Sequence, residues 1–173
     1  VGNYMYFSYS YSENEDYENY KGEIYRLNIN TDKKEKLIDT NSCFTVFNNK
    51  IYYFKDRDMN AYDLKSGKIF PICQNKDKSA IVVSDHNYIY YTNWDNGIAE
   101  PEDYVLHIID EEGKVINDVN IPDCEYFVGS DGRRLYMETN NREVLGADIS
   151  QINSNVKWET VFTISDDGEI NIG

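Results

Sequence analysis

The chain has 173 residues, enough for one domain with a sizeable core, and we expect a single domain over residues 1–173. Its 31 acidic and 17 basic residues give a net charge of −14. Such a charge repels phosphate backbones and anionic lipid surfaces, which argues against a nucleic-acid partner, and no apolar run is long enough for direct insertion into a membrane.

Aromatic residues are abundant, with 16 Tyr, 7 Phe and 2 Trp against only 3 Pro. Because aromatic side chains favour pleated, half-buried surfaces, this composition predicts an all-β protein. The three cysteines, Cys43, Cys73 and Cys124, show no metal-site or redox spacing, and we expect buried thiols. The chain opens at Val1 without an initiator Met, so we expect a mature or shortened piece of a protein.

One aromatic phrase recurs along the chain. It reads Tyr-Met-Tyr-Phe at 4–7, Ile-Tyr-Tyr-Phe at 51–54, Ile-Tyr-Tyr-Thr at 89–92 and Leu-Tyr-Met-Glu at 135–138. We call the strands that carry this phrase the anchor strands. Their spacing of roughly 38 to 47 residues matches the length of a four-stranded propeller blade. The repeat therefore predicts an all-β fold, a β-propeller with about four blades of four antiparallel strands in this chain.

Further strands follow each anchor, separated by pairs such as Asn48-Asn49 and Ser66-Gly67. These pairs predict hairpin turns, since Asn and Gly tolerate positive φ. The first anchor is followed by strands at 23–28 and 33–37. The second blade is expected at 44–47, 51–54, 60–64 and 68–73, the third at 80–83, 89–92, 104–109 and 114–121, and a further set at 125–162 with a loose last hairpin at 150–155.

The anchor strands are apolar on consecutive residues, which is typical of strands covered on both faces. We therefore expect them at the buried centre of each blade. Because they share one register of the repeat, Tyr6, Tyr53, Tyr91 and Met137 are predicted to occupy equivalent positions.

The ends of the chain leave the blade number of the ring open. The first anchor has no strand before it, whereas 160–164 is expected to be an extra first strand and 169–172 a further second strand. Two hypotheses follow: a compact four-blade ring with a frayed tail, or a segment of a longer ring of about six to eight blades.

The phrase at 89–93, Ile-Tyr-Tyr-Thr-Asn, resembles the Tyr-Trp-Thr-Asp strand of low-density-lipoprotein-receptor-type propellers. Over the whole chain the pattern is similar to uncharacterised propeller domains of this type in clostridial and related bacteria. The resemblance implies a binding module at the cell surface or secreted, and it supplies no catalytic residues.

The cofactor-like and metal-like motifs of the chain are incomplete. Residues 61–67 resemble the quinoprotein blade phrase, but Pro71 stands where that phrase places its stacking Trp, so we expect a shared turn and no cofactor. Residues 56–60 alternate oxygen ligands like the start of a calcium loop, yet Ala61 replaces the required Gly and Gly67 the closing Glu. His86 and His107 are too few for a histidine-based metal or nucleophile site, and no metal is expected.

Two long connections provide the functional signal. Residues 10–22 and 93–103 are insertions between a second and a third strand, and such connections emerge on one face of a propeller, where insertions often mark a binding surface. Their aromatic and acidic side chains suit a basic or hydroxyl-rich partner. The candidate binding residues are Tyr11, Glu15, Asp16, Tyr17, Tyr20, Trp94, Asp95, Glu102 and Asp103.

The leading functional hypothesis is a non-enzymatic propeller that binds a protein or carbohydrate, surface-exposed or secreted. Two alternatives remain open. One is a carbohydrate-active or lyase-type enzyme whose carboxylates converge in space. The other is a structural spacer in a larger surface protein.

Overall fold

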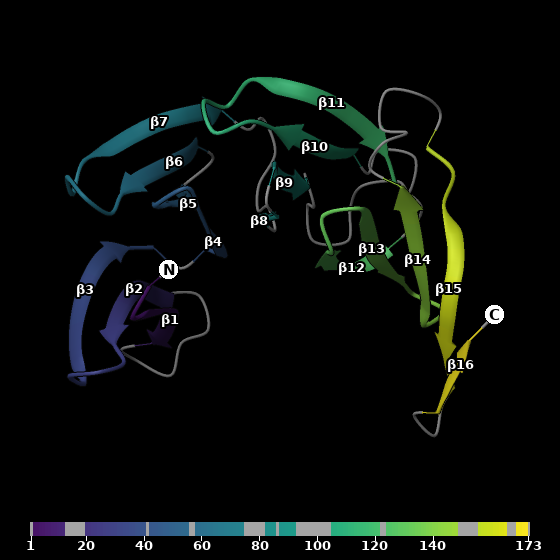
Figure 1. Cartoon of the computed structure of the whole chain (residues 1–173), viewed down its shortest axis with the longest axis horizontal. Coiled ribbons are helices and arrows are strands. Elements are labelled where there is room, and N and C mark those ends of the chain that lie inside the picture. Colours follow the sequence, from purple (N-terminus) through teal and green to yellow (C-terminus); the bar gives the residue numbers. More distant parts are fainter. Residues whose placement is uncertain are drawn as a thin grey trace. The chain divides into compact units, whose positions relative to one another are not determined.

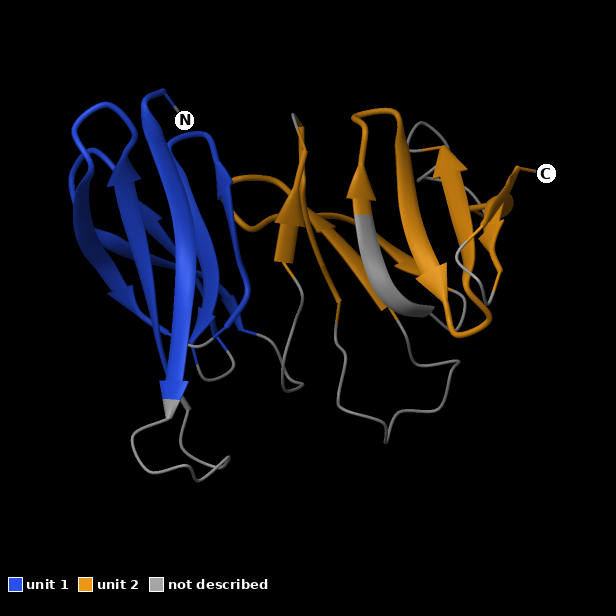
Figure 2. Ribbon diagram, turned by 90° about the horizontal axis from the view of Figure 1, so that it is seen from below, with its two compact units in different colours: residues 1–76 blue, residues 77–173 orange. Residues whose placement is uncertain are grey.

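The computed structural model describes the chain except for residues 1, 13–19, 41, 56–57, 75–81, 86, 93–104, 122–123, 149–155, 166–168 and 173. The described residues form antiparallel strands joined by turns (Figure 1). They belong to two compact units, residues 1–76 and residues 77–173, which are described separately below (Figure 2). Among the described residues there is no helix with the length and apolarity needed to span a bilayer.

Unit 1 contains two sheets whose strands pair in chain order. The first sheet has three strands and the second has four. The bounds are β1 (Tyr4–Ser12), β2 (Tyr20–Asn28) and β3 (Lys33–Asp39) in the first sheet, and β4 (Phe44–Phe47), β5 (Lys50–Lys55), β6 (Asp58–Asp63) and β7 (Ile69–Gln74) in the second.

Unit 2 also contains two sheets. The third sheet has four strands and the fourth has five, again in chain order. The bounds are β8 (Val82–Ser84), β9 (Ile89–Thr92), β10 (Val105–Ile109) and β11 (Val115–Asn120) in the third sheet, and β12 (Cys124–Ser130), β13 (Arg134–Thr139), β14 (Glu143–Asp148), β15 (Glu159–Ile164) and β16 (Ile170–Ile172) in the fourth.

The predicted turns are confirmed where the structure describes them. Asn48 and Asn49 have φ of 46° and 60°, the pair of positive values that a tight two-residue hairpin requires. Gly67, Gly113 and Gly132 also have positive φ, at 69°, 83° and 84°. The hairpin chemistry at these positions is local, which explains why the sequence predicts it.

Apolar packing between neighbouring sheets forms the core of each unit. In unit 1, Ile24 and Ile38 of the first sheet pack with Ile51 and Tyr53 of the second. In unit 2 the corresponding buried cluster comprises Tyr90, Leu106, Ile108, Val119, Ile121, Leu135 and Met137. Strands β5 and β9 are buried on consecutive residues, as predicted for anchors covered on both faces.

Two anchors depart from that prediction. In β1, Tyr4, Met5 and Tyr9 are 38%, 55% and 58% exposed, and Tyr6 is only half-buried. The reason is that β1 is the edge of its sheet, so no strand covers it on that side. In β13 burial alternates along the strand, with Leu135 and Met137 buried between half-buried neighbours.

The prediction for the last two strands is wrong, since both belong to the fourth sheet and neither begins a new blade. The segment 160–164, expected to begin a new blade, lies in β15 and pairs antiparallel with β14 as the fourth strand of the fourth sheet. β16, expected to be a second strand of that new blade, pairs with β15 in the same sheet. Gly146 on β14 makes room for this arrangement, since a Cβ there would lie 2.8 Å from the Val161 Cγ2 atom.

The thiol prediction also needs correction. Cys43 is exposed and Cys73 is half-buried. Cys43 lies immediately before strand β4 and outside the sheet pairing, so its side chain is exposed.

In unit 2, a hydrogen-bonded carboxyl ties the third sheet to the fourth. Asp85 Oδ2 accepts hydrogen bonds from the Tyr90 hydroxyl at 2.6 Å and from the Ser130 hydroxyl at 2.9 Å. Its Oδ1 accepts from the backbone N–H groups of Asn87 and Tyr88. Burial raises the pKa of Asp85, but these hydrogen bonds lower it by more, so the pKa lies below its ordinary value.

Truncating Tyr53 should be strongly destabilising, because the side chain is 1% exposed and its removal leaves a cavity between the sheets of unit 1. We expect Tyr53→Ala to reduce the free energy of unfolding by about 3 kcal/mol or more in a denaturant melt. The control is Tyr9→Ala on exposed β1, which should change it by less than about 1 kcal/mol. An equally small loss in Tyr53→Ala would contradict the packing described for the core.

Asp85 should make the free energy of unfolding depend on pH in the acidic range. A carboxyl whose folded pKa lies below its unfolded value of about 3.9 stabilises the fold above that pH, and this contribution is lost as the pH falls through the folded pKa. We expect Asp85→Asn to lose about 1–3 kcal/mol at pH 7 and to show a shallower fall in stability between about pH 5 and pH 2. Glu112→Gln, at an exposed turn, should follow the wild-type curve. Parallel curves for Asp85→Asn and wild type would refute the assigned role.

Candidate functional site

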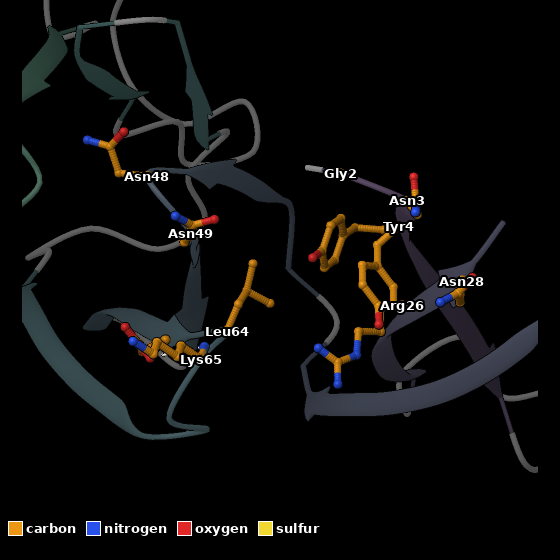
Figure 3. Close-up of a pocket in the computed structure, with 11 residues that line it drawn as sticks. Gly2, Asn3, Tyr4, Arg26, Asn28, Asn48, Asn49, Leu64 and Lys65 are labelled. Carbon is orange, nitrogen blue, oxygen red and sulfur yellow. Dashed lines mark hydrogen bonds between the residues drawn. The ribbon is translucent and has the colours of Figure 1, made fainter. Parts of the chain in front are cut away.

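A cavity of about 650 Å³ opens between the two sheets of unit 1, within the range of small-ligand sites (Figure 3). It lies at the end of the sheets where β1 begins, β2 ends and the hairpin turns of the second sheet lie. It is lined by Gly2, Asn3, Tyr4, Tyr6, Arg26, Asn28, Asn48, Asn49, Asp63, Leu64 and Lys65.

Strand alternation and register build the first wall. Tyr4 and Tyr6 lie two residues apart on β1 and therefore on one face of the sheet. In the register of β1 and β2, Tyr4 lies opposite Asn28 and Tyr6 opposite Arg26, which brings these four side chains to the same face. The Arg26 guanidinium lies 5.0 Å from the centre of the Tyr4 ring and is paired with Glu35 on the neighbouring strand β3, with Nη2 to Oε2 at 2.7 Å.

Two turns build the second wall. The Asn48-Asn49 turn joins β4 to β5, and Leu64 follows β6; the Leu64 N–H donates to the Asn49 carbonyl oxygen at 3.0 Å. Asp63 Oδ1 accepts from the backbone N–H groups of Lys65 and Ser66 at 3.1 and 2.6 Å. These bonds hold both turns in one conformation, so this wall is preorganised.

The charges of the lining are mostly compensated by neighbours. The hydrogen bond to Glu35 raises the pKa of Arg26, so that guanidinium stays charged and paired. The Ser66 backbone N–H, together with the other groups of the turn, lowers the pKa of Asp63, so that carboxylate is charged and engaged in its own turn. Burial raises the pKa of Tyr6, and the Arg26 charge offsets part of the rise. Tyr6 is therefore a neutral hydroxyl at physiological pH.

Several polar groups of the lining are left without partners. The amides of Asn3 and Asn49 and the hydroxyls of Tyr4 and Tyr6 make no hydrogen bond to any described side chain or backbone group. Lys65 likewise forms no ion pair within the described part of the chain. The cavity thus presents hydrogen-bonding groups that a ligand or water can satisfy.

The residues predicted from the two insertions are only partly described. Tyr11 is half-buried near the end of β1, with its ring stacked 5.8 Å from that of Tyr9. Tyr20 is the first residue of β2 and lies opposite Ser12, so the hairpin extends further into the expected connection than predicted. Glu15, Asp16, Tyr17, Trp94, Asp95, Glu102 and Asp103 lie outside the described residues.

Sequence reasoning did not find the cavity. The cavity lies at the Tyr4 end of β1, whereas the predicted binding connection follows Ser12 at the other end of that strand in the sequence. Its turn residues were interpreted only as hairpin chemistry. The sequence does contain a signal for it. Tyr4 and Tyr6 lie two residues apart on β1, and Arg26 and Asn28 lie two residues apart on the paired strand β2, so each pair shares one face of its strand.

No metal site is found within the described ranges, where no three His, Cys, Asp or Glu side chains gather in a suitable group. Asp58 and Asn60 of the calcium-like segment lie in β6, and Asp56 and Arg57 lie outside the described residues. His107 is held in a row across three strands, with Nδ1 2.7 Å from Asp118 Oδ1 and its ring stacked 4.6 Å from that of Tyr91.

Comparison with known proteins shows the fold. No protein-family model matches the sequence, and no curated protein matches it either. A solved acylaminoacyl peptidase of Pyrococcus horikoshii superposes with 95% of this chain and 32% of its own, at a TM-score of 0.68 and 14% identity. An oligogalacturonate lyase in complex with manganese covers 94% of this chain and 51% of its own, with a TM-score of 0.64 and 10% identity.

TolB from Acinetobacter baumannii is also similar, over 92% of this chain and 41% of its own, at a TM-score of 0.58 and 14% identity. The chain thus spans about a third of the peptidase and about half of the lyase. At these identities the likeness concerns the fold alone. With the four antiparallel sheets, it defines the chain as a β-propeller protein of about four blades.

Proposed function

We propose that the chain is a non-enzymatic binding module, a single propeller domain over residues 1–173, surface-exposed or secreted. The observation that carries the proposal is the cavity of unit 1, where unpaired amides and hydroxyls converge on a preformed space. The resemblance of residues 89–93 to the receptor-type strand supports the placement outside the cell and the kinship with clostridial-type propellers.

The chemistry of the lining favours binding over catalysis. Its one carboxylate, Asp63, is engaged by the N–H groups of Lys65 and Ser66. The lining contains no His, Cys or Ser, so it offers neither the usual general base nor an activated nucleophile. Tyr, Asn and Arg are instead the residue types that position a ligand by contact area and hydrogen bonds.

A second surface is proposed at the two insertions. Tyr17 and Trp94 are its aromatic contacts, flanked by the carboxylates of residues such as Asp16 and Asp95. Large aromatic residues dominate binding energy, while surrounding charge steers the encounter with an oppositely charged protein. This surface suits a protein partner, whereas the cavity suits a small ligand.

The cavity can be tested without knowing its ligand. We expect Tyr4→Ala to abolish the binding of at least one member of a panel of oligosaccharides and short peptides in ligand-detected saturation-transfer NMR, because Tyr4 supplies the exposed ring of the lining. Tyr9→Ala is the matched control, since Tyr9 lies on the same strand but outside the lining. No binding by the wild type, or equal binding by both variants, would refute the cavity as a ligand site.

The insertion surface predicts a salt effect. Screening acts on long-range steering, so added salt should slow association with a captured protein partner more than it speeds dissociation in surface plasmon resonance. The double variant Tyr17→Ala, Trp94→Ala should stay folded by circular dichroism and bind at least about tenfold more weakly. Unchanged capture by this folded variant would place the protein-binding surface elsewhere.

A further inference from the structure

We infer that the ligand of the unit 1 cavity is a neutral saccharide, a ring-shaped molecule rich in hydroxyl groups and without net charge. The inference rests on the proposed binding function and specifies the chemistry of its ligand. Three features of the lining carry it: the type of its unpaired polar groups, the compensation of its charges, and the exposed Tyr4 ring beside Arg26.

The unpaired amides and hydroxyls of the lining can form hydrogen bonds with the hydroxyl groups of a ligand. Each Asn amide offers a donor and an acceptor side by side, and each Tyr hydroxyl can do either. The side-chain amides of Asn3 and Asn49 make no hydrogen bond to any described residue. The Oδ1 atom of Asn28 accepts from the N–H groups of Asn30 and Thr31, which leaves the side-chain NH₂ group of Asn28 as a donor. A hydroxyl is also both donor and acceptor, so neighbouring sugar hydroxyls can satisfy such amides in pairs.

The charges argue against an ionic ligand. Arg26 is bound to Glu35, and Asp63 is bound to the backbone of its own turn. A charged ligand would therefore meet a guanidinium already paired with a carboxylate and a carboxylate already held by backbone N–H groups, and it would gain little net attraction from either. Lys65 remains, but it is an exposed side chain at the end of a turn, where solvent screens its charge.

The aromatic side chains supply the apolar contact. Tyr4 is 38% exposed, and Arg26 stacked on its ring restricts the ring's motion. A fixed aromatic surface with polar groups at its margin fits the C–H face and the hydroxyl rim of a pyranose. A peptide would need pockets for apolar side chains, and Leu64 is the one aliphatic residue of the lining.

The test measures binding by isothermal titration calorimetry on the whole chain. The probes are neutral trisaccharides of glucose, galactose, mannose and N-acetylglucosamine, the trimer of galacturonic acid as an anionic counterpart, and trialanine as a peptide. Asn49→Gly removes one amide while keeping a residue that tolerates the positive φ of that turn. Asn141→Gly, at an exposed turn of unit 2 outside the lining, is the matched control.

We expect at least one neutral trisaccharide to bind, with affinity changed less than about twofold between about 50 and about 500 mM salt. Asn49→Gly should weaken it about tenfold, and Asn141→Gly should leave it unchanged.

Other outcomes overturn the inference in distinguishable ways. Preferential binding of the galacturonic acid trimer, weakened by Lys65→Gln but not by Lys68→Gln, would show an anionic ligand and leave the binding function standing. Binding of trialanine alone, lost in Tyr4→Ala, would show a peptide ligand and would also leave the proposed binding function standing. If no probe binds and the Tyr4→Ala comparison also shows no ligand, both the saccharide inference and the proposed cavity function fall.

Discussion

The apolar contact between the two sheets of unit 1 is the constraint on which the described site depends. Ile24 and Ile38 pack against Ile51 and Tyr53, and this packing fixes the separation of the sheets. Toward the start of β1 the same faces carry Tyr4, Arg26 and Asn28 in place of aliphatic residues. The sheets are held together by the core and cannot close over these polar side chains, so the interface ends in a cavity.

The sheet interface of unit 2 has a different polar margin. Its sheets also pack through an apolar cluster, with Tyr90 and Leu106 against Leu135 and Met137. There the polar group at the margin is Asp85, and its carboxylate is fully engaged by Tyr90, Ser130 and two backbone N–H groups. A satisfied carboxylate stabilises an interface, whereas unpaired amides and hydroxyls leave it open to a ligand. This difference accounts for the open polar margin of the interface in unit 1.

The candidate site was hidden from sequence reasoning because its members are far apart in the chain. Tyr4, Arg26, Asn49 and Lys65 come from four different segments, and only pairing register and sheet packing bring them together. The two long insertions were predictable because the length of a connection can be read directly from the sequence. Asn49 and Asp63 are predictable as turn residues from the local sequence. Whether the side chain of such a residue contributes to a binding site depends on which residues of the other sheet lie opposite it.

Local chemistry determined what the sequence could predict. The anchor phrase predicts the repeat and the strand order, and residues that tolerate positive φ, such as Asn48 and Gly113, predict the turns. Both signals depend on interactions within a few residues of the chain, so they can be read from the sequence. Tertiary structure decided the rest: the edge position that exposes Tyr4, the pairing of β15 with β14, and the cavity. These depend on which hydrogen-bonding edge and which apolar face a strand meets, and distant residues supply both.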